Sequence, residues 1–182
     1  MANQKFKKEL NSLGAKAKEA KEFLLNSSVD TRNDALKFTC EEIHKNRSDL
    51  FKENEKDLEE AKKLDLQNSF IDRLELNEKR VDSMIDGLNK VINLNDPIGE
   101  LEEMNPSPSG FKVSKMRVPL GTIGIIYESR PNVTADASAL CIKSGNASIL
   151  RGGSEAVRSN NHIVAQVRKG PVSYTHLRAH ET

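Results

Sequence analysis

The sequence predicts an α/β protein, in which a helical N-terminal layer is followed by the start of a parallel sheet that is truncated after two strands. Three observations predict it. Residues 1–95 are rich in Lys, Glu, Leu and Ala, with apolar residues at helical spacing. Residues 117–160 run in the order strand, turn, helix, turn, strand, turn, helix. The composition changes near Asp96, where the segment 95–99, NDPIG, breaks the helical half.

The helical half is expected to contain several amphipathic helices. In the first, apolar residues step alternately by four and three, which places them on one stripe. That stripe consists of Phe6, Leu10, Leu13, Ala17, Ala20 and Leu24. Residues 26–30 interrupt the pattern, and a second helix is expected from about Thr31. Another is expected from about Asn77 to Asn93, with Val81, Met84, Ile85, Leu88, Val91 and Ile92 at helical spacing. Residues 52–63 are almost all charged, which predicts a solvated helix face.

The second half predicts two parallel strands joined by a helix. Residues 111–118 alternate imperfectly and suggest a leading strand, and residues 124–127 and 147–150 are short β-rich runs. Between the latter two, a helix opens at Pro131 and stops at Gly145. A helical crossover returns the chain to the same end of the sheet, so the two strands run parallel.

Polar residues follow both of these strands at their carboxyl ends. The first strand stops at Glu128, Ser129 and Arg130, and the second is followed by the run 151–155, RGGSE. Ligands of open parallel sheets bind in the crevice beyond the carboxyl ends of the strands. We therefore place the functional site at these two turns.

Length and charge exclude several classes. The chain has 182 residues, enough for one ordinary domain, and its 28 basic and 27 acidic residues give no reason to expect nucleic acid as a partner. No apolar run approaches the roughly 20 residues that span a bilayer, so we expect no membrane and a cytoplasmic protein. Cys40 and Cys141 show no CxxC spacing, lie within helical patterns and are expected to be buried core cysteines.

The end of the chain continues neither a strand nor a helix pattern. A two-stranded sheet leaves its faces and edge uncovered, so we expect a fragment whose residues 170–182 are non-native or disordered. His176 and His180 stand at i, i+4 and would chelate a metal if helical, but a tail foreign to the domain is the favoured interpretation and no metal is expected.

The segment RVPLGTIGIIYESRPNVTADASALCIKSGNASILRGGSEA resembles the gamma-glutamyl phosphate reductase family of the aldehyde dehydrogenase superfamily throughout. The segments 70–74, FIDRL, and 95–99 also match phrases of that family, and the resemblance covers residues from about 10 to 165. It is specific, because YESRPNVT and ILRGGSEA differ from the tryptophan-asparagine-phenylalanine-proline and lysine-proline-serine-glutamate turns of ordinary aldehyde dehydrogenases. The sheet is then expected to be Rossmann-like, of the aldehyde dehydrogenase type.

The resemblance implies an enzyme that reduces L-glutamate 5-phosphate to L-glutamate 5-semialdehyde with NADPH and releases phosphate, the second step of proline biosynthesis. It implies a helical part over 1–110, the start of the NADPH-binding domain over 111–169, and a homo-oligomer for the full-length protein. The nucleophilic cysteine of the family would lie in a downstream catalytic domain, so no catalytic cysteine is expected here. The alternatives are a non-catalytic helical interaction module and the reductase part of a bifunctional kinase-reductase.

The resemblance also assigns roles to the second turn. Arg151 would meet the cofactor 2'-phosphate, and Ser154 or Glu155 a ribose hydroxyl. Gly152 and Gly153 would allow close backbone approach, and Ser154 would cap the next helix. The plainer interpretation is a glycine turn with a serine cap.

The first turn has two interpretations as well. Arg130 would meet the carboxylate or phosphate of the substrate, because a guanidinium pairs with both. Ser129 or Asn132 would take the place of the oxyanion-stabilising asparagine of the superfamily. Alternatively, Asn132 is a helix N-cap and Glu128 forms a structural ion pair with Arg130.

Overall fold

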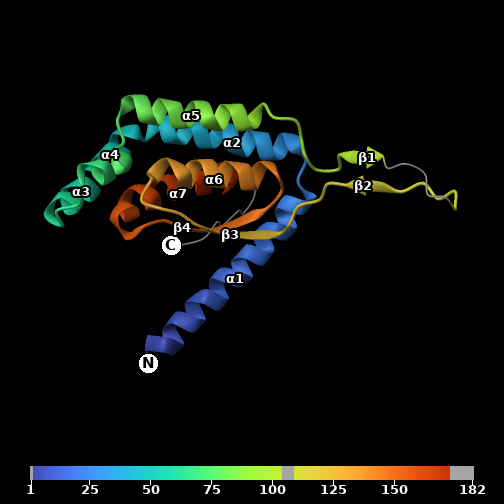
Figure 1. Cartoon of the computed structure of the whole chain (residues 1–182), viewed down its shortest axis with the longest axis horizontal. Coiled ribbons are helices and arrows are strands. Elements are labelled where there is room, and N and C mark those ends of the chain that lie inside the picture. Colours follow the sequence, from blue (N-terminus) through green and yellow to red (C-terminus); the bar gives the residue numbers. More distant parts are fainter. Residues whose placement is uncertain (1, 104–108, 173–182) are drawn as a thin grey trace.

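The computed structural model describes residues 2–103 and 109–172, and Figure 1 shows its elements stacked in layers. The parallel strands β3 (Thr122–Ile126) and β4 (Ala147–Arg151) form the sheet near the centre. One face is covered by α6 (Pro131–Lys143) and α7 (Val157–Val172), on which α2 (Val29–Lys45) and α5 (Glu78–Ile92) pack as an outer layer. The long helix α1 (Ala2–Asn26) crosses the other face.

The N-terminal helices follow the predicted periodicity with two differences. Helix α2 begins at Val29, slightly before the expected Thr31, because the Ser28 side chain accepts a hydrogen bond from the Thr31 backbone N–H at 3.1 Å. The stripe of α1 is buried at Ala17, Ala20 and Leu24, whereas Leu10 is 49% exposed on the half of the helix that extends beyond the sheet. The side chain of Phe6 lies outside the described part.

Two further helices complete this half. Helix α3 (Arg47–Lys63) contains the charged run, and the short α4 (Asn68–Leu74) leads into α5. Helix α5 agrees with the expected range, and its buried residues are Val81, Met84, Leu88 and Ile92. One apolar core joins the N-terminal helices to the sheet layer. Its largest fully buried members are Leu36, Ile43, Leu50, Leu88, Ile163 and Val81.

A small antiparallel hairpin stands apart from the parallel sheet. The strand expected over 111–118 is β2 (Ser114–Met116), and its partner is β1 (Leu101–Glu103), with Leu101 opposite Met116. The expected strand is therefore present and precedes the parallel pair in the chain, but it belongs to a separate antiparallel sheet, and its partner β1 was not predicted. Three-residue strands carry too little periodicity to be recognised from sequence.

The parallel pair agrees with the prediction. Thr122 lies opposite Ala147 and Ile126 opposite Arg151, so the carboxyl ends of both strands meet at one edge. The crossover helix α6 ends at Lys143, and Gly145, two residues later, has a φ of +70°, the left-handed conformation typical of a glycine after a helix. A single 3₁₀ turn, η1 (Ser154–Ala156), then leads into α7. None of the described helices is long and apolar enough to cross a membrane.

Candidate functional site

The two polar turns meet where the parallel strands end. The backbone N–H of Tyr127 donates to the Arg151 carbonyl at 3.0 Å, which extends the pairing by one residue beyond β3. The hydroxyl of Ser129 then donates to Glu155 Oε2 at 2.5 Å. Residues from the two predicted clusters, 26 positions apart in sequence, thus form one contact, as the parallel arrangement requires.

Glu155 is held by serines on both carboxylate oxygens. Ser129 binds Oε2, and the Ser154 hydroxyl donates to Oε1 at 3.0 Å. The hydrogen bond from Ser129 is the main reason that the pKa of Glu155 lies below its ordinary value. Glu155 is therefore an oriented, ionised acceptor at the carboxyl end of β4.

Ser154 occupies a different place from the predicted helix cap. The residue before η1 is Gly153, and no side chain caps that turn. The Ser154 hydroxyl is directed to Glu155 instead of to a backbone N–H. The cap prediction is therefore wrong, because the chain makes a 3₁₀ turn before α7 begins.

Gly152 and Gly153 make room for neighbouring side chains of the protein itself. A Cβ on Gly152 would collide with Asn160 Nδ2 and would lie 3.0 Å from the Tyr127 ring. A Cβ on Gly153 would collide with the Ser129 hydroxyl and would approach Glu155 Oε2 to 2.8 Å. Both glycines are thus needed for the contacts between the two turns, whatever else approaches their backbone.

A chain of hydrogen bonds that joins the first turn to α6 and α7 was not predicted from sequence. The Tyr127 hydroxyl lies 2.7 Å from Thr134 Oγ1, which donates to Asn160 Oδ1 at 2.9 Å. Thr134 and Asn160 are buried on α6 and α7. The chain ties the end of β3 to both helices and fixes the position of the turns relative to each other. Its only sequence signal is that polar residues stand at inward positions of two helices.

Arg130 and Asn132 line a groove of about 480 Å³, and Glu155 is not among its lining residues. The opposite wall comes from α4, the α4–α5 loop and α5. Arg130 is the N-cap residue of α6, with Pro131 at the first helical position, so the alternative that Asn132 is the cap is wrong. Asn132 Nδ2 instead donates to Asp136 Oδ2 at 3.3 Å. The structure thereby separates Ser129 from the other two candidates of the first turn.

The ion pairs around Glu128 are long and exposed. Glu128 Oε2 lies 3.8 Å from Arg130 Nε and 3.6 Å from Arg73 Nη1, and the three side chains are 48–72% exposed. Surface pairs of this kind contribute little to stability. The expected ion pair between Glu128 and Arg130 is present, but at 3.8 Å and largely exposed it contributes little to the stability of the turn. Arg151, the last residue of β4, is exposed beside the Glu155 turn.

Neither cysteine is an activated nucleophile. Cys40 and Cys141 are free and buried, as expected of core residues. Burial raises the pKa of the Cys40 thiol to about 11 and also raises that of Cys141. No metal-binding group of His, Cys, Asp and Glu occurs among the described residues, and His176 and His180 lie outside them.

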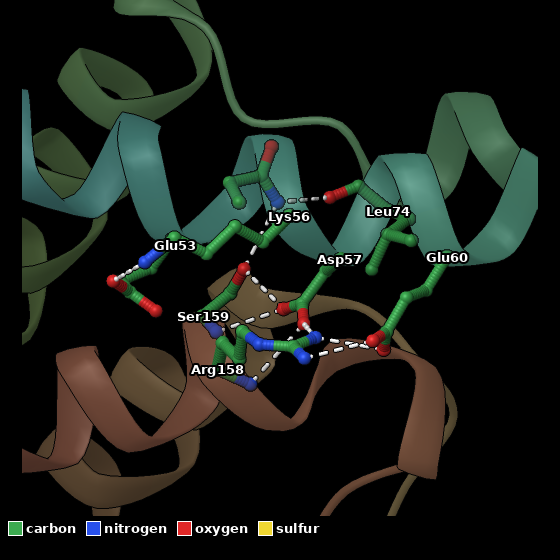
Figure 2. Close-up of polar contacts among 8 residues, drawn as sticks. Glu53, Lys56, Asp57, Glu60, Leu74, Arg158 and Ser159 are labelled. Atoms are coloured by element: carbon green, nitrogen blue, oxygen red, sulfur yellow. Dashed lines mark hydrogen bonds and ion pairs between the residues drawn. The ribbon is translucent and has the colours of Figure 1, made fainter.

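The start of α7 is anchored by a buried polar cluster on α3, which Figure 2 shows. Asp57 on α3 is 1% exposed, and its Oδ2 accepts from the Ser159 backbone N–H at 2.8 Å and from the Ser159 hydroxyl at 2.7 Å. Its Oδ1 accepts from the Arg158 backbone N–H at 3.3 Å. The carboxylate thus caps the positive end of the α7 dipole from another helix.

Two neighbours complete the cluster. Buried Asn54 donates to the Leu74 carbonyl at 2.9 Å and to Ser159 Oγ at 3.0 Å, and accepts from the Leu76 N–H at 2.8 Å. Arg158 forms a two-pronged pair with Glu60 at 2.7 and 2.8 Å. The predicted solvated face is confirmed for most of residues 52–63, but Asn54 and Asp57 are buried and point inward.

Comparisons with known proteins agree with the fold. The chain is 51% identical over 162 residues to a gamma-glutamyl phosphate reductase of Clostridium botulinum, covering 89% of this chain and 39% of that protein. It is 50% identical over 159 residues to the enzyme of that name from Ruthia magnifica, covering 87% and 38%. The chain thus spans about two fifths of the length of the curated relatives it matches. No family model matches.

Solved structures agree with this result. The crystal structure of the gamma-glutamyl phosphate reductase of Thermotoga maritima matches with a TM-score of 0.84 and 40% identity, over 91% of this chain and 40% of that one. The crystal structure of the Saccharomyces cerevisiae enzyme of that name matches with a TM-score of 0.83 and 30% sequence identity, over 90% of this chain and 42% of that one. A putative aldehyde dehydrogenase of Bacillus subtilis, 20% identical, shares the fold with a TM-score of 0.70 over 88% of this chain and 33% of that one. The chain is therefore homologous to the gamma-glutamyl phosphate reductases over about two fifths of their length, and its fold is that of the N-terminal part of an aldehyde dehydrogenase.

Proposed function

We propose that this chain forms the N-terminal part of an NADPH-dependent reductase that converts L-glutamate 5-phosphate to L-glutamate 5-semialdehyde and releases phosphate. The observation that carries the proposal is the 51% identity to a reductase of this name over 162 residues. The contact between Ser129 and Glu155 supports it, because it places polar groups at the strand ends where open parallel sheets bind ligands.

The residues of the second turn fit a dinucleotide. Glu155 is an ionised carboxylate whose orientation is fixed by Ser129 and Ser154, and a carboxylate accepts hydrogen bonds from ribose hydroxyls. Arg151 supplies an exposed cation beside it for the 2'-phosphate that distinguishes NADPH from NADH. We therefore assign cofactor binding to residues 151–155. NADPH bound there would supply the hydride.

The described cysteines do not supply the nucleophile of this reaction. Attack on an acyl phosphate needs a thiolate, and burial keeps Cys40 and Cys141 protonated. We place the attacking thiol in the three fifths of the relatives that this chain does not span. The Ser129 hydroxyl would then donate a hydrogen bond either to Glu155, as here, or to the developing oxyanion of the substrate.

We also propose that the full-length enzyme is a cytoplasmic homo-oligomer, in which residues 1–110 form a helical part and residues 111–169 begin the NADPH-binding domain. The β1–β2 hairpin supports an assembly contact, since its paired residues Leu101 and Met116 are 64% and 57% exposed. Large apolar side chains on a protruding hairpin are typical of surfaces that another chain or domain covers.

A chimera tests the function. Residues 10–165 of this chain replace the matching segment of the Clostridium botulinum reductase, and NADPH oxidation is followed with L-glutamate 5-phosphate. We expect activity that falls strongly on changing Glu155→Ala. Arg151→Gln should raise KM for NADPH and leave KM for NADH unchanged. A folded chimera without activity would contradict the proposal.

A further inference from the structure

The groove beside Arg130 carries charges of both signs on facing walls. The α6 wall contributes Arg130, Asn132 and Asp136, and the wall from α4 and α5 contributes Arg73 and Arg80 among others. Its volume of about 480 Å³ lies within the range that small-molecule sites occupy. None of residues 151–155 lines it, so it is separate from the proposed cofactor turn.

Two of the three arginines that line the groove have only a distant carboxylate partner in the described part of the chain. Arg73 and Arg130 share a single carboxylate, Glu128, at 3.6 and 3.8 Å, which is too long for a hydrogen bond in either pair. Arg80, by contrast, is already held by the Asp72 side chain at 2.8 Å and by the Glu75 carbonyl at 2.9 Å. Two guanidinium groups with one distant carboxylate leave room for a second carboxylate, which pairs well with an arginine fork.

Asp136 provides a negative group without a compensating cation. It is partly buried, and its hydrogen bond comes from the neutral amide of Asn132 at 3.3 Å. None of the basic side chains that the structure describes pairs with it. Burial raises the pKa of its carboxyl above the ordinary value. Asp136 lines the groove, and on the facing helix a Cβ at Gly87 would lie 3.4 Å from its Oδ1, so a residue larger than glycine would narrow the groove at the carboxylate. A cation placed there would offset the desolvation of Asp136.

We propose that this groove binds the zwitterionic end of an α-amino acid, with the carboxylate between Arg73 and Arg130 and the ammonium group on Asp136. The inference rests on the proposed function in that the amino acid is the glutamyl group of the reductase substrate. Asp136 then determines specificity, because it distinguishes a substrate with an ammonium group from a dicarboxylate that lacks one.

Calorimetric titration of the whole chain tests the site with two probes. L-Glutamate carries the ammonium group, and glutarate is the same molecule without it. We expect the unaltered chain to bind L-glutamate about tenfold or more tightly than glutarate, since one favourable charge contact of about 1.4 kcal/mol corresponds to that ratio. Asp136→Asn keeps the shape and should abolish this preference, whereas Asp86→Asn, at an exposed aspartate of α5 outside the groove, should preserve it.

Each outcome decides the proposal. Arg130→Gln should weaken both probes, because both carry a carboxylate. Equal affinities for L-glutamate and glutarate, no binding of L-glutamate, or an equal loss for both probes in Asp136→Asn would overturn it. The chimera tests the reductase function separately. An active chimera together with an Asp136→Asn chain that keeps its preference for L-glutamate would refute only the proposal for the groove. Binding of L-glutamate with the expected preference together with an inactive chimera would refute only the reductase function.

Discussion

Replacing Asp57 by alanine should lower the free energy of unfolding by about 3–5 kcal/mol. The carboxylate is 1% exposed and accepts from the Ser159 N–H at 2.8 Å and from the Ser159 hydroxyl at 2.7 Å. A hydrogen bond to a charged group contributes about 1.5–3 kcal/mol, and both of these donors would stay buried after the change. Loss of the negative charge at the start of α7 acts in the same direction.

Two variants control for the interpretation. Asp57→Asn keeps one carbonyl oxygen as an acceptor, so we expect a smaller loss of about 1–2 kcal/mol. Asp49→Ala removes an exposed carboxylate from the first turn of the same helix, 63% exposed and paired with Lys52. It should lower stability by no more than about 1 kcal/mol, because a surface ion pair and an exposed charge at a helix N-terminus each contribute little.

Urea unfolding followed by far-ultraviolet circular dichroism measures all three variants. The midpoint should shift and the slope with urea should stay constant, since the change acts on the folded state and not on the surface exposed by unfolding. An effect of Asp57→Ala no larger than that of Asp49→Ala would refute the reasoning, because the buried carboxylate would then contribute nothing that an exposed one does not.

Three further predictions concern the turns and the thiols. The Ser129 hydrogen bond lowers the pKa of Glu155, so this stabilisation is present above the unfolded pKa and is lost as pH falls through the folded value. Ser129→Ala should raise that pKa, as a carboxyl titration by NMR would show; an unchanged curve contradicts this. Gly153→Ala should destabilise the fold by about 1–3 kcal/mol in urea, because its Cβ collides with Ser129. Cys40 and Cys141 should react with a thiol reagent only after unfolding, and fast labelling of the folded chain would disprove their burial.

The sheet and its turns could be predicted because their determinants are local. Strand-forming runs end directly at polar residues, and Gly145 stops the helix between them in the left-handed conformation. A helical crossover of this length allows only a parallel pair. From that point, the meeting of Ser129 and Glu155 follows from topology, although their hydrogen bond does not.

The role of Asp57 could not be predicted because its partner lies 102 residues away. Within α3, Leu50, Asn54, Asp57 and Ala61 form a stripe with spacings of four, three and four, and all are buried. Two of the four are polar, so the stripe does not stand out in a charged run. Only the position of α7 shows that hydrogen-bond donors, such as the Ser159 N–H, lie within reach of Asp57.

Asn132 illustrates a different error. An asparagine after a proline at the start of a helix resembles a cap in sequence. Proline prefers the first helical position, and the residue before it is biased to extended backbone, so the cap belongs to Arg130. Asn132 falls inside the first turn, where its side chain is free to reach Asp136 one turn later.

The helical layer has a part in the candidate site as well as in the core. Glu155 lies in a 3₁₀ turn between the end of β4 and the start of α7, so its position depends on where α7 begins. At that start, Asp57 of α3 accepts a hydrogen bond from the Ser159 backbone N–H. The following residue, Asn160, accepts one from Thr134 of α6. Because both supports are buried and come from distant segments, a change in α3 should displace Glu155 without touching the sheet. The charged helix that looked least informative in sequence therefore helps to orient the carboxylate to which we assign the cofactor.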